Sequence, residues 1–120
     1  MPVSENTRQE LIRLCSESRT RRSNWTKERP TKWNPGEAYD QEPAEPGEAA
    51  PPPAPFTRNG AWARIVQELE GGCVLKLKIL DIPKGKKAYE LHFRDAMGQR
   101  VYVKLQILSG EVLARSFHLG

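Results

Sequence analysis

The sequence predicts a small α+β domain in which one helix packs on a four-stranded antiparallel meander sheet. Three observations favour this fold: most Val, Ile, Leu and Phe residues follow Phe56, a stretch of helical period begins soon after it, and strand-like runs separated by turn residues fill the rest. We therefore expect residues 56–120 to supply almost the whole core. A core of this size leaves little room for a deep pocket, so any chemistry is expected on a surface or in a shallow cleft.

The two segments before this domain differ in charge. Residues 1–35 contain eight basic and four acidic residues, whereas residues 36–55 contain five acidic residues, six prolines and no basic residue. We interpret the first segment as a basic arm. The second is expected to be a disordered, acidic, Pro-rich linker, because this composition cannot bury enough apolar surface to offset the entropy lost on ordering.

The arm begins with a predicted short helix over residues 5–18, where Leu11 and Leu14 lie at helical spacing. A basic stretch follows, in which Trp25 and Trp33 are interleaved with arginines and lysines. Two interpretations stay open. Either the tryptophans pack against the domain, or the arm is extended and binds nucleic acid or a partner, since Arg and Lys meet phosphates while Trp stacks on bases.

Within the domain, a helix is predicted over residues 60–70, because its apolar residues share one helical face, with Asn59 as its cap and two glycines after it. The later runs alternate with period two, and Ser109-Gly110 is a two-residue hairpin loop between the last pair. The four predicted strands are Cys73–Leu80, Lys87–Arg94, Arg100–Leu108 and Glu111–His118.

The alternation predicts which side chains face the helix and which face solvent. The residues expected toward the helix are Leu75, Leu77, Ile79, Tyr89, Leu91, Phe93, Val101, Val103, Leu105, Ile107, Leu113 and Phe117. The residues expected on the opposite, wet face are Lys76, Lys78, Glu90, His92, Arg94, Tyr102, Lys104, Gln106, Val112, Ala114, Ser116 and His118. Arg115 falls on the core side in this pattern, which a β-bulge or a position at the open end of the sheet would resolve.

The wet face mixes cations with aromatic and imidazole rings. Small antiparallel sheets commonly have one solvated face, and solvation explains each of these residues taken singly. The mixture, however, also suits RNA, since cations neutralise phosphates and rings stack on unpaired bases. We therefore predict RNA contacts by Lys78, His92, Arg94, Lys104 and Arg115.

The same groups suffice for metal-free RNA cleavage, in which the ribose 2′-hydroxyl attacks the adjacent phosphorus. One group takes the 2′-proton, another protonates the leaving 5′-oxygen, and cations stabilise the phosphorane charge. His118, His92, Tyr102 and the lysines could fill these roles. We expect His118 to be the general acid or base, because an imidazole exchanges protons near neutral pH.

Other chemistries find little support in the sequence. Cys15 and Cys73 lie far apart without a CxxC pattern and only two histidines are present, so we expect no metal and no other cofactor. We see no glycine-rich phosphate loop, paired carboxylates or Ser-His-Asp signature. No apolar run approaches the ~18 residues of a membrane span, which leads us to expect a soluble, cytoplasmic protein with free thiols.

The last three predicted strands contain Glu90-Leu-His-Phe93, Val101-Tyr-Val-Lys-Leu105 and Val112-Leu-Ala-Arg-Ser-Phe-His118. Over about residues 61–118, this series resembles the RelE-like type II toxins, most closely the motility quorum-sensing regulator toxins, which end in a Val-Tyr-Leu-Lys run and a Ser-Phe-Lys sequence. The resemblance implies a compact α+β ribonuclease fold, metal-free cleavage of messenger RNA and neutralisation by a cognate antitoxin.

Carried over to this sequence, the resemblance implies catalytic roles for Tyr102, for His118 in place of the family's lysine, and for Lys76 on the first strand of the sheet. The chain departs from the family at Glu90, near the family's Gln, because a carboxylate brings negative charge toward the phosphate. Residues 1–55 are a further departure. Two alternatives therefore stay open: a noncatalytic basic module that binds nucleic acid or a partner protein, and a toxin fold that has lost cleavage.

Overall fold

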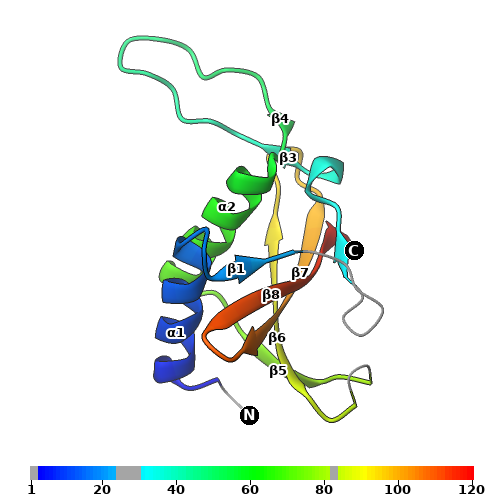
Figure 1. Ribbon diagram of the computed structural model, residues 1–120. Helices are drawn as coiled ribbons and strands as arrows, with labels where there is room; N and C mark the ends of the chain where they lie inside the picture. Colours follow the sequence, from blue (N-terminus) through cyan, green and yellow to red (C-terminus); the bar gives the residue numbers. More distant parts are fainter. Residues whose placement is uncertain (1–2, 24–30, 82–83) are drawn as a thin grey trace.

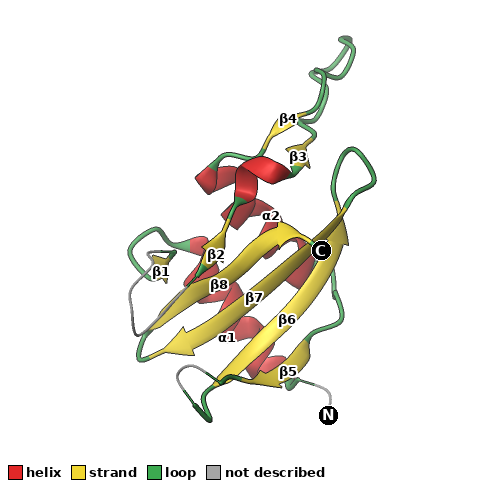
Figure 2. Cartoon of the chain, turned by 90° about the vertical axis from the view of Figure 1, so that its right-hand side faces the viewer, coloured by secondary structure: helices red, strands yellow, loops and turns green. Residues whose placement is uncertain are grey.

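The computed structural model describes residues 3–23, 31–81 and 84–120. Within these residues the chain forms two α-helices, one 3-10 helix, a six-stranded sheet and a two-stranded sheet. Both α-helices lie on one face of the larger sheet, and no described helix covers the other face, which we call the open face (Figure 1 and Figure 2). The elements are α1 (Glu5–Ser16), β1 (Arg21–Arg22), β2 (Lys32–Trp33), η1 (Pro35–Glu37), β3 (Tyr39–Asp40), β4 (Ala54–Pro55), α2 (Arg58–Glu70), β5 (Lys76–Ile79), β6 (Lys87–Arg94), β7 (Arg100–Leu108) and β8 (Glu111–Leu119).

The predicted α+β class is confirmed, but the sheet and the helix layer are both larger than expected. β5 to β8 pair antiparallel in sequence order, and β1 and β2 add to the outer edge of β8 in parallel. α1 joins α2 because Leu11, Leu14 and Cys15 are fully buried in the common core. The prediction of four antiparallel strands under a single helix is therefore wrong: the sheet is mixed, and a second helix covers it.

Both helices begin at side chains that cap them. The Ser4 hydroxyl accepts a hydrogen bond from the Thr7 amide at 3.2 Å, and the Thr57 hydroxyl accepts one from the Gly60 amide at 2.9 Å. Such caps satisfy amides that have no partner inside the helix. Asn59, the predicted cap of the second helix, instead lies within α2, because the helix already begins before it.

The N-terminal arm packs onto the domain where the structure describes it. The Trp33 ring centroid lies 5.1 Å from that of Trp62 on α2 and 5.3 Å from that of Phe117 on β8. Packing is therefore the correct interpretation for Trp33, whereas Trp25 lies outside the described residues. Because Trp33 and α1 both pack with the core, the expectation that residues 56–120 supply almost all of it is wrong.

The acidic Pro-rich segment is tied to the domain at both of its ends. β3 and β4 pair antiparallel, and Ala38 beside them is fully buried. The Asp95 carboxylate, in the turn between β6 and β7, accepts a hydrogen bond from the Tyr39 amide at 2.9 Å. The prediction of a disordered linker is wrong for these ends, because contacts with a distant turn hold a segment that has no core of its own. Between them, residues 41–50 form an exposed loop that projects away from the sheet (Figure 1).

A β-bulge interrupts β8 at Arg115. Lys104 of β7 pairs with Ser116, but the next residue, Leu105, pairs with Ala114, so Arg115 is the extra residue of the bulge. One extra residue reverses the alternation of side chains along a strand. The bulge therefore accounts for the position of Arg115, which strict alternation leaves on the core side.

The bulge also changes the faces of its neighbours. Val112 and Ala114, predicted on the wet face, are fully buried in the core under the helices. Leu113, predicted toward the helix, lies opposite Gln106 on the face away from the helices, where it is 2% exposed. These predictions are wrong because the period-two count was carried across the bulge, whereas Phe117 and His118, beyond it, lie on the faces predicted.

β5 forms the free edge of the sheet and is shorter than predicted. It spans Lys76–Ile79 instead of Cys73–Leu80. Leu77 and Ile79, predicted to face the core, are 41% and 55% exposed, whereas Leu75 is buried. The prediction that these two residues are buried is wrong, because the helices do not cover the sheet at β5.

Candidate nucleic-acid interface

Three ring side chains lie in line across the open face of the sheet. His92 of β6, Tyr102 of β7 and His118 of β8 are directly opposite one another. The ring centroids of His92 and Tyr102 are 5.2 Å apart, and those of Tyr102 and His118 are 5.4 Å apart. We call these three residues the ring row; side by side, they form a continuous surface of the kind on which unpaired bases stack.

Cations border the ring row on both sides. Toward the β5–β6 turn they are Lys32, Lys76, Lys78 and Lys104, and on the other side they are Arg94 and Arg100. These cations lie close enough to affect one another. Burial and the charges of neighbouring cations lower the pKa of Lys104, although the charge of Glu90 opposes the shift. A surface that crowds cations in this way attracts phosphates.

Glu90 lies among these cations, on the strand beside Tyr102. Its side chain is 14% exposed and has Lys78 Nζ at 3.7 Å, and Lys76 and Lys104 lie directly opposite it on the two neighbouring strands. Burial raises the pKa of Tyr102 well above its ordinary value, and the charge of Glu90 and a hydrogen bond to it add to the shift. Tyr102 is therefore a protonated hydrogen-bond donor. The nearby lysines compensate the negative charge of Glu90, which in the sequence argued against phosphate binding at this position.

His118 has a fixed tautomer. Its Nδ1 lies 2.8 Å from the backbone oxygen of Leu119, and because a carbonyl oxygen only accepts, Nδ1 carries the proton and donates. In the neutral ring, Nε2 is then the nitrogen with the free lone pair. Proton exchange with a ligand on this face would take place at Nε2.

His92 is held in the neutral form. Its Nε2 accepts a hydrogen bond from the Arg100 guanidinium at 3.3 Å, and its buried Nδ1 has no hydrogen-bond partner among the described residues. Burial lowers the pKa of His92, and the charges of Arg100 and Lys76 lower it further against the opposing effect of Glu90. Of the two histidines, His118 is therefore the better placed for proton transfer, and His92 serves as a neutral ring.

Comparison with known proteins does not place the chain in a family. No family model, curated protein or solved structure matches it. Among the described residues, no helix is long and apolar enough to cross a membrane. The same residues include no group of three or more His, Cys, Asp or Glu side chains that could hold a metal ion.

The structure brings most of the predicted site residues together. His118, Tyr102 and His92 form the ring row, Lys76 and Lys104 lie in the next row of the register, and Lys78 lies one position farther along β5, beside Glu90. Arg94 lies at the border, where a shallow cavity of about 240 Å³ is lined by His92, Phe93, Arg94 and Arg100. Arg115 is 7% exposed, with its Nη1 3.4 Å from Gln106 Oε1, so it offers a phosphate little accessible surface.

Sequence reasoning missed two cations of this face. Arg100 has the same parity as Tyr102 on β7, so the alternation could have identified it. Lys32 could not have been found in this way, because its place depends on the parallel pairing of β2 with Ser116 and Phe117 of β8. β2 is only two residues long, so the sequence shows no strand pattern that predicts this pairing.

Proposed function

We propose that the open face binds single-stranded RNA and cleaves it without a metal, by attack of the ribose 2′-hydroxyl on the adjacent phosphorus. The observation that carries the proposal is the ring row of His92, Tyr102 and His118 between two groups of cations. Rings take the bases by stacking, and the cations on either side take the phosphates. This division suits an unpaired strand, whose bases are free to turn onto the sheet.

The proton transfers are assigned to Glu90 and His118. The Glu90 carboxylate takes the 2′-proton, and His118, protonated at Nε2, gives a proton to the leaving 5′-oxygen, so the products carry a 2′,3′-cyclic phosphate and a 5′-hydroxyl. Tyr102, which stays protonated, donates a hydrogen bond between the two. Lys76 and Lys104 stabilise the charge of the phosphorane. His92 has no proton-transfer role, since Arg100 occupies its Nε2.

The likeness to RelE-like toxins is part of this proposal and rests on the sequences of the last three strands. It adds messenger RNA as the substrate and a neutralising antitoxin as the protein partner. The free edge of β5 supports a protein partner, because it combines unpaired backbone groups with the exposed side chains of Leu77 and Ile79.

The alternative is a noncatalytic module that binds nucleic acid or a partner protein through the same face. One observation favours it: the cavity beside the ring row is shallow, with about 240 Å³, and a flat face binds a strand without enclosing the reacting phosphate. Both functions predict RNA binding. They differ in whether the bound strand is cut.

The deciding experiment incubates the full chain with a single-stranded RNA in the presence of EDTA. We expect cleavage with 2′,3′-cyclic phosphate ends, and at saturating RNA His118→Ala should slow it by roughly 100-fold, a loss beyond the weaker binding caused by removing one stacking ring. His92→Ala is the matched control and should slow cleavage by less than about tenfold, since it removes only a stacking ring. An active protein should also arrest growth when expressed without its partner.

Three outcomes separate the possibilities. Binding without cleavage by the parent protein would establish the noncatalytic alternative. Equal cleavage by the parent and by His118→Ala would remove His118 from the mechanism. An absence of RNA binding would mean that the open face is simply solvated.

A further inference from the structure

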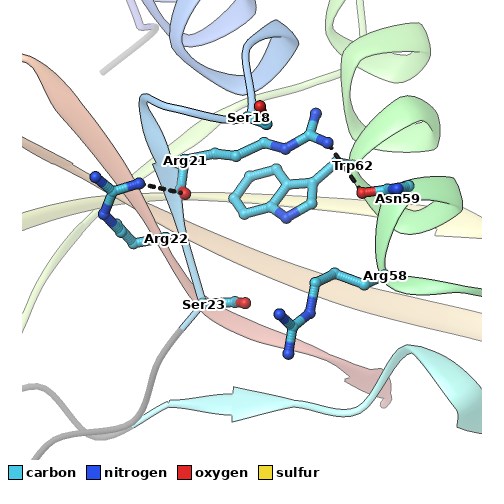
Figure 3. Close-up of a pocket in the computed structure, with 7 residues that line it drawn as sticks. All are labelled: Ser18, Arg21, Arg22, Ser23, Arg58, Asn59 and Trp62. Atoms are coloured by element: carbon cyan, nitrogen blue, oxygen red, sulfur yellow. Dashed lines mark hydrogen bonds between the residues drawn. The ribbon is translucent and has the colours of Figure 1, made fainter.

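A second basic site lies on the helix side of the sheet, away from the open face. A cavity of about 340 Å³ opens between β1 and the start of α2 (Figure 3). Its lining residues are Ser18, Arg21, Arg22, Ser23, Arg58, Asn59 and Trp62. None of them is acidic, and all of them carry side chains that can form hydrogen bonds.

Arg21 is fixed in this cavity by three contacts. Its guanidinium donates to the Cys15 carbonyl at 3.1 Å and to Asn59 Oδ1 at 3.2 Å, and its Cζ lies 5.6 Å from the centre of the Trp62 ring (Figure 3). The two hydrogen bonds use two of the five N–H groups of the side chain, and the other three have no partner among the described residues. Trp62 itself is 2% exposed, so Arg21 lies against a buried ring.

Arg58 adds a second cation from the first position of α2. It is exposed and makes no ion pair within the described residues. Arg22, in contrast, donates a hydrogen bond to the Arg21 backbone oxygen at 3.1 Å, on the side away from the Arg21 guanidinium and Arg58 (Figure 3), and it pairs with Glu111 at 2.6 Å, which balances its charge. The cavity therefore presents two guanidinium groups whose charges no lining carboxylate offsets.

We propose that this cavity binds a phosphomonoester group. Guanidinium groups bind phosphate oxygens through paired, charge-assisted hydrogen bonds, and a dianion offsets both cations at once. The hydroxyls of Ser18, before β1, and Ser23, directly after it, supply further donors in the cavity. Holding Arg21 in place before binding reduces the entropy that a ligand must overcome.

The cavity recognises the phosphate more than the group attached to it. The Trp62 ring lies under Arg21 and is buried, so it is not available for stacking on a base. The volume nevertheless exceeds the need of a lone phosphate and lies at the lower end of small-molecule sites. Two sources share this chemistry: a free nucleoside 5′-monophosphate and the 5′-phosphorylated end of an RNA. The site does not depend on the function proposed for the open face.

The test is calorimetric titration of the full chain, at low chloride, with inorganic phosphate, adenosine 5′-monophosphate and adenosine. We expect phosphate and the nucleotide to bind and adenosine not to bind. Arg58→Gln should weaken phosphate binding about tenfold or more, because it removes a charged donor and its hydrogen bonds. This side chain is exposed, so the variant should fold normally. Arg13→Gln on α1, exposed and outside the cavity, is the control with the same change in charge.

A second measurement identifies the residues and the source. Phosphate should shift the indole N–H resonance of Trp62 in the parent and not in Arg58→Gln. Uncleavable 2′-O-methyl oligonucleotides with and without a 5′-phosphate then distinguish the sources: tighter binding of the phosphorylated strand, lost in Arg58→Gln, assigns the site to RNA ends. Binding of the mononucleotide alone assigns it to free nucleotides. Equal phosphate affinity in the parent and Arg58→Gln, or an equal loss in Arg13→Gln, would overturn the proposal.

Discussion

The two faces of the larger sheet are built from alternate residues, but one face buries apolar side chains and the other carries rings and charged groups. Val101, Val103 and Phe117 are fully buried beneath the helices, while Tyr102 and His118, their neighbours along the chain, lie in the ring row. Each large apolar side chain buried on the covered face stabilises the fold by about 1.5–3 kcal/mol. The comparison predicts that stability and the proposed RNA binding can be changed separately, by substitutions one position apart.

The open face does not maximise stability. Burial lowers the pKa of Lys104, the charges of neighbouring cations lower it further, and Glu90, a partly buried carboxylate among these cations, opposes the shift. Repulsion among like charges and the desolvation of ionised groups both cost free energy in the absence of a ligand. Such an arrangement is typical of a surface shaped by what it binds.

The largest effect should come from the covered face. Phe117→Ala is expected to lower the free energy of unfolding by about 3–5 kcal/mol, because it opens a cavity among the rings of Trp33, Phe56 and Phe93. His118→Ala, one position along, should lower it by about 1 kcal/mol or less. Urea unfolding measures both. Similar losses in the two variants would show that the faces are not independent.

The next effect separates binding from cleavage within the open face. Glu90→Gln should slow RNA cleavage by roughly 100-fold, since the amide cannot accept the 2′-proton. The same variant should bind RNA more tightly, because it removes a negative charge that faces the phosphates. Single-turnover kinetics and equilibrium binding give the two quantities. Glu10→Gln, at an exposed position of α1, is the control and should change neither.

A loss of cleavage accompanied by weaker binding would point to a structural role for Glu90. Removal of the carboxylate also predicts a change at Tyr102, whose raised pKa owes part of its shift to that charge. The absorbance titration of the phenol should therefore move to lower pH in Glu90→Gln. No such movement would mean that the two side chains do not interact in solution.

Local patterns in the sequence predicted the elements of the domain, and long-range pairing decided where the prediction failed. The alternation placed His92, Tyr102 and Lys104 on the open face correctly, because a regular strand offers each side chain only two directions. It failed at Leu113, since the bulge at Arg115 depends on how β8 aligns with β7. No local sequence pattern predicts that alignment of the two strands.

The N-terminal half gives the same lesson at a larger scale. The apolar residues of α1 predict a short helix. They do not predict that Leu14 is fully buried beside α2. The ends of the acidic segment have the composition of a linker, yet Tyr39 is tied to Asp95 of a turn far along the chain. The basic cavity likewise combines Arg21 with Arg58 from a separate element, which a sequence scan for local motifs does not detect.

A smaller effect concerns the cations beside the ring row. Each phosphate contact on a single strand contributes about 0.7 to the slope of log affinity against log salt concentration, so Lys76→Ala and Lys104→Ala should each flatten the slope by about that amount. Lys87→Ala is the matched control, because Lys87 lies on β6 but belongs to the opposite face. Binding measured over a series of salt concentrations tests this. Equal slopes in all four proteins would show that the phosphates lie elsewhere.

The smallest effect is the pH dependence caused by His92. Burial and the nearby cations lower the pKa of this imidazole below its ordinary value of 6.5, so the unfolded chain binds a proton at His92 before the folded chain does. Above pH 6.5 both forms are neutral and His92 contributes no pH dependence. As the pH falls from about 6.5 toward the lower pKa of the folded state, the unfolded state gains protons first and the free energy of unfolding decreases.

In His92→Gln this decrease should be smaller over the same window, measured by urea unfolding at a series of pH values. His118→Gln is the control and should keep the pH dependence that His92 causes. A parent and His92→Gln with parallel stability curves would mean that burial and the nearby cations do not lower the pKa of His92 in solution.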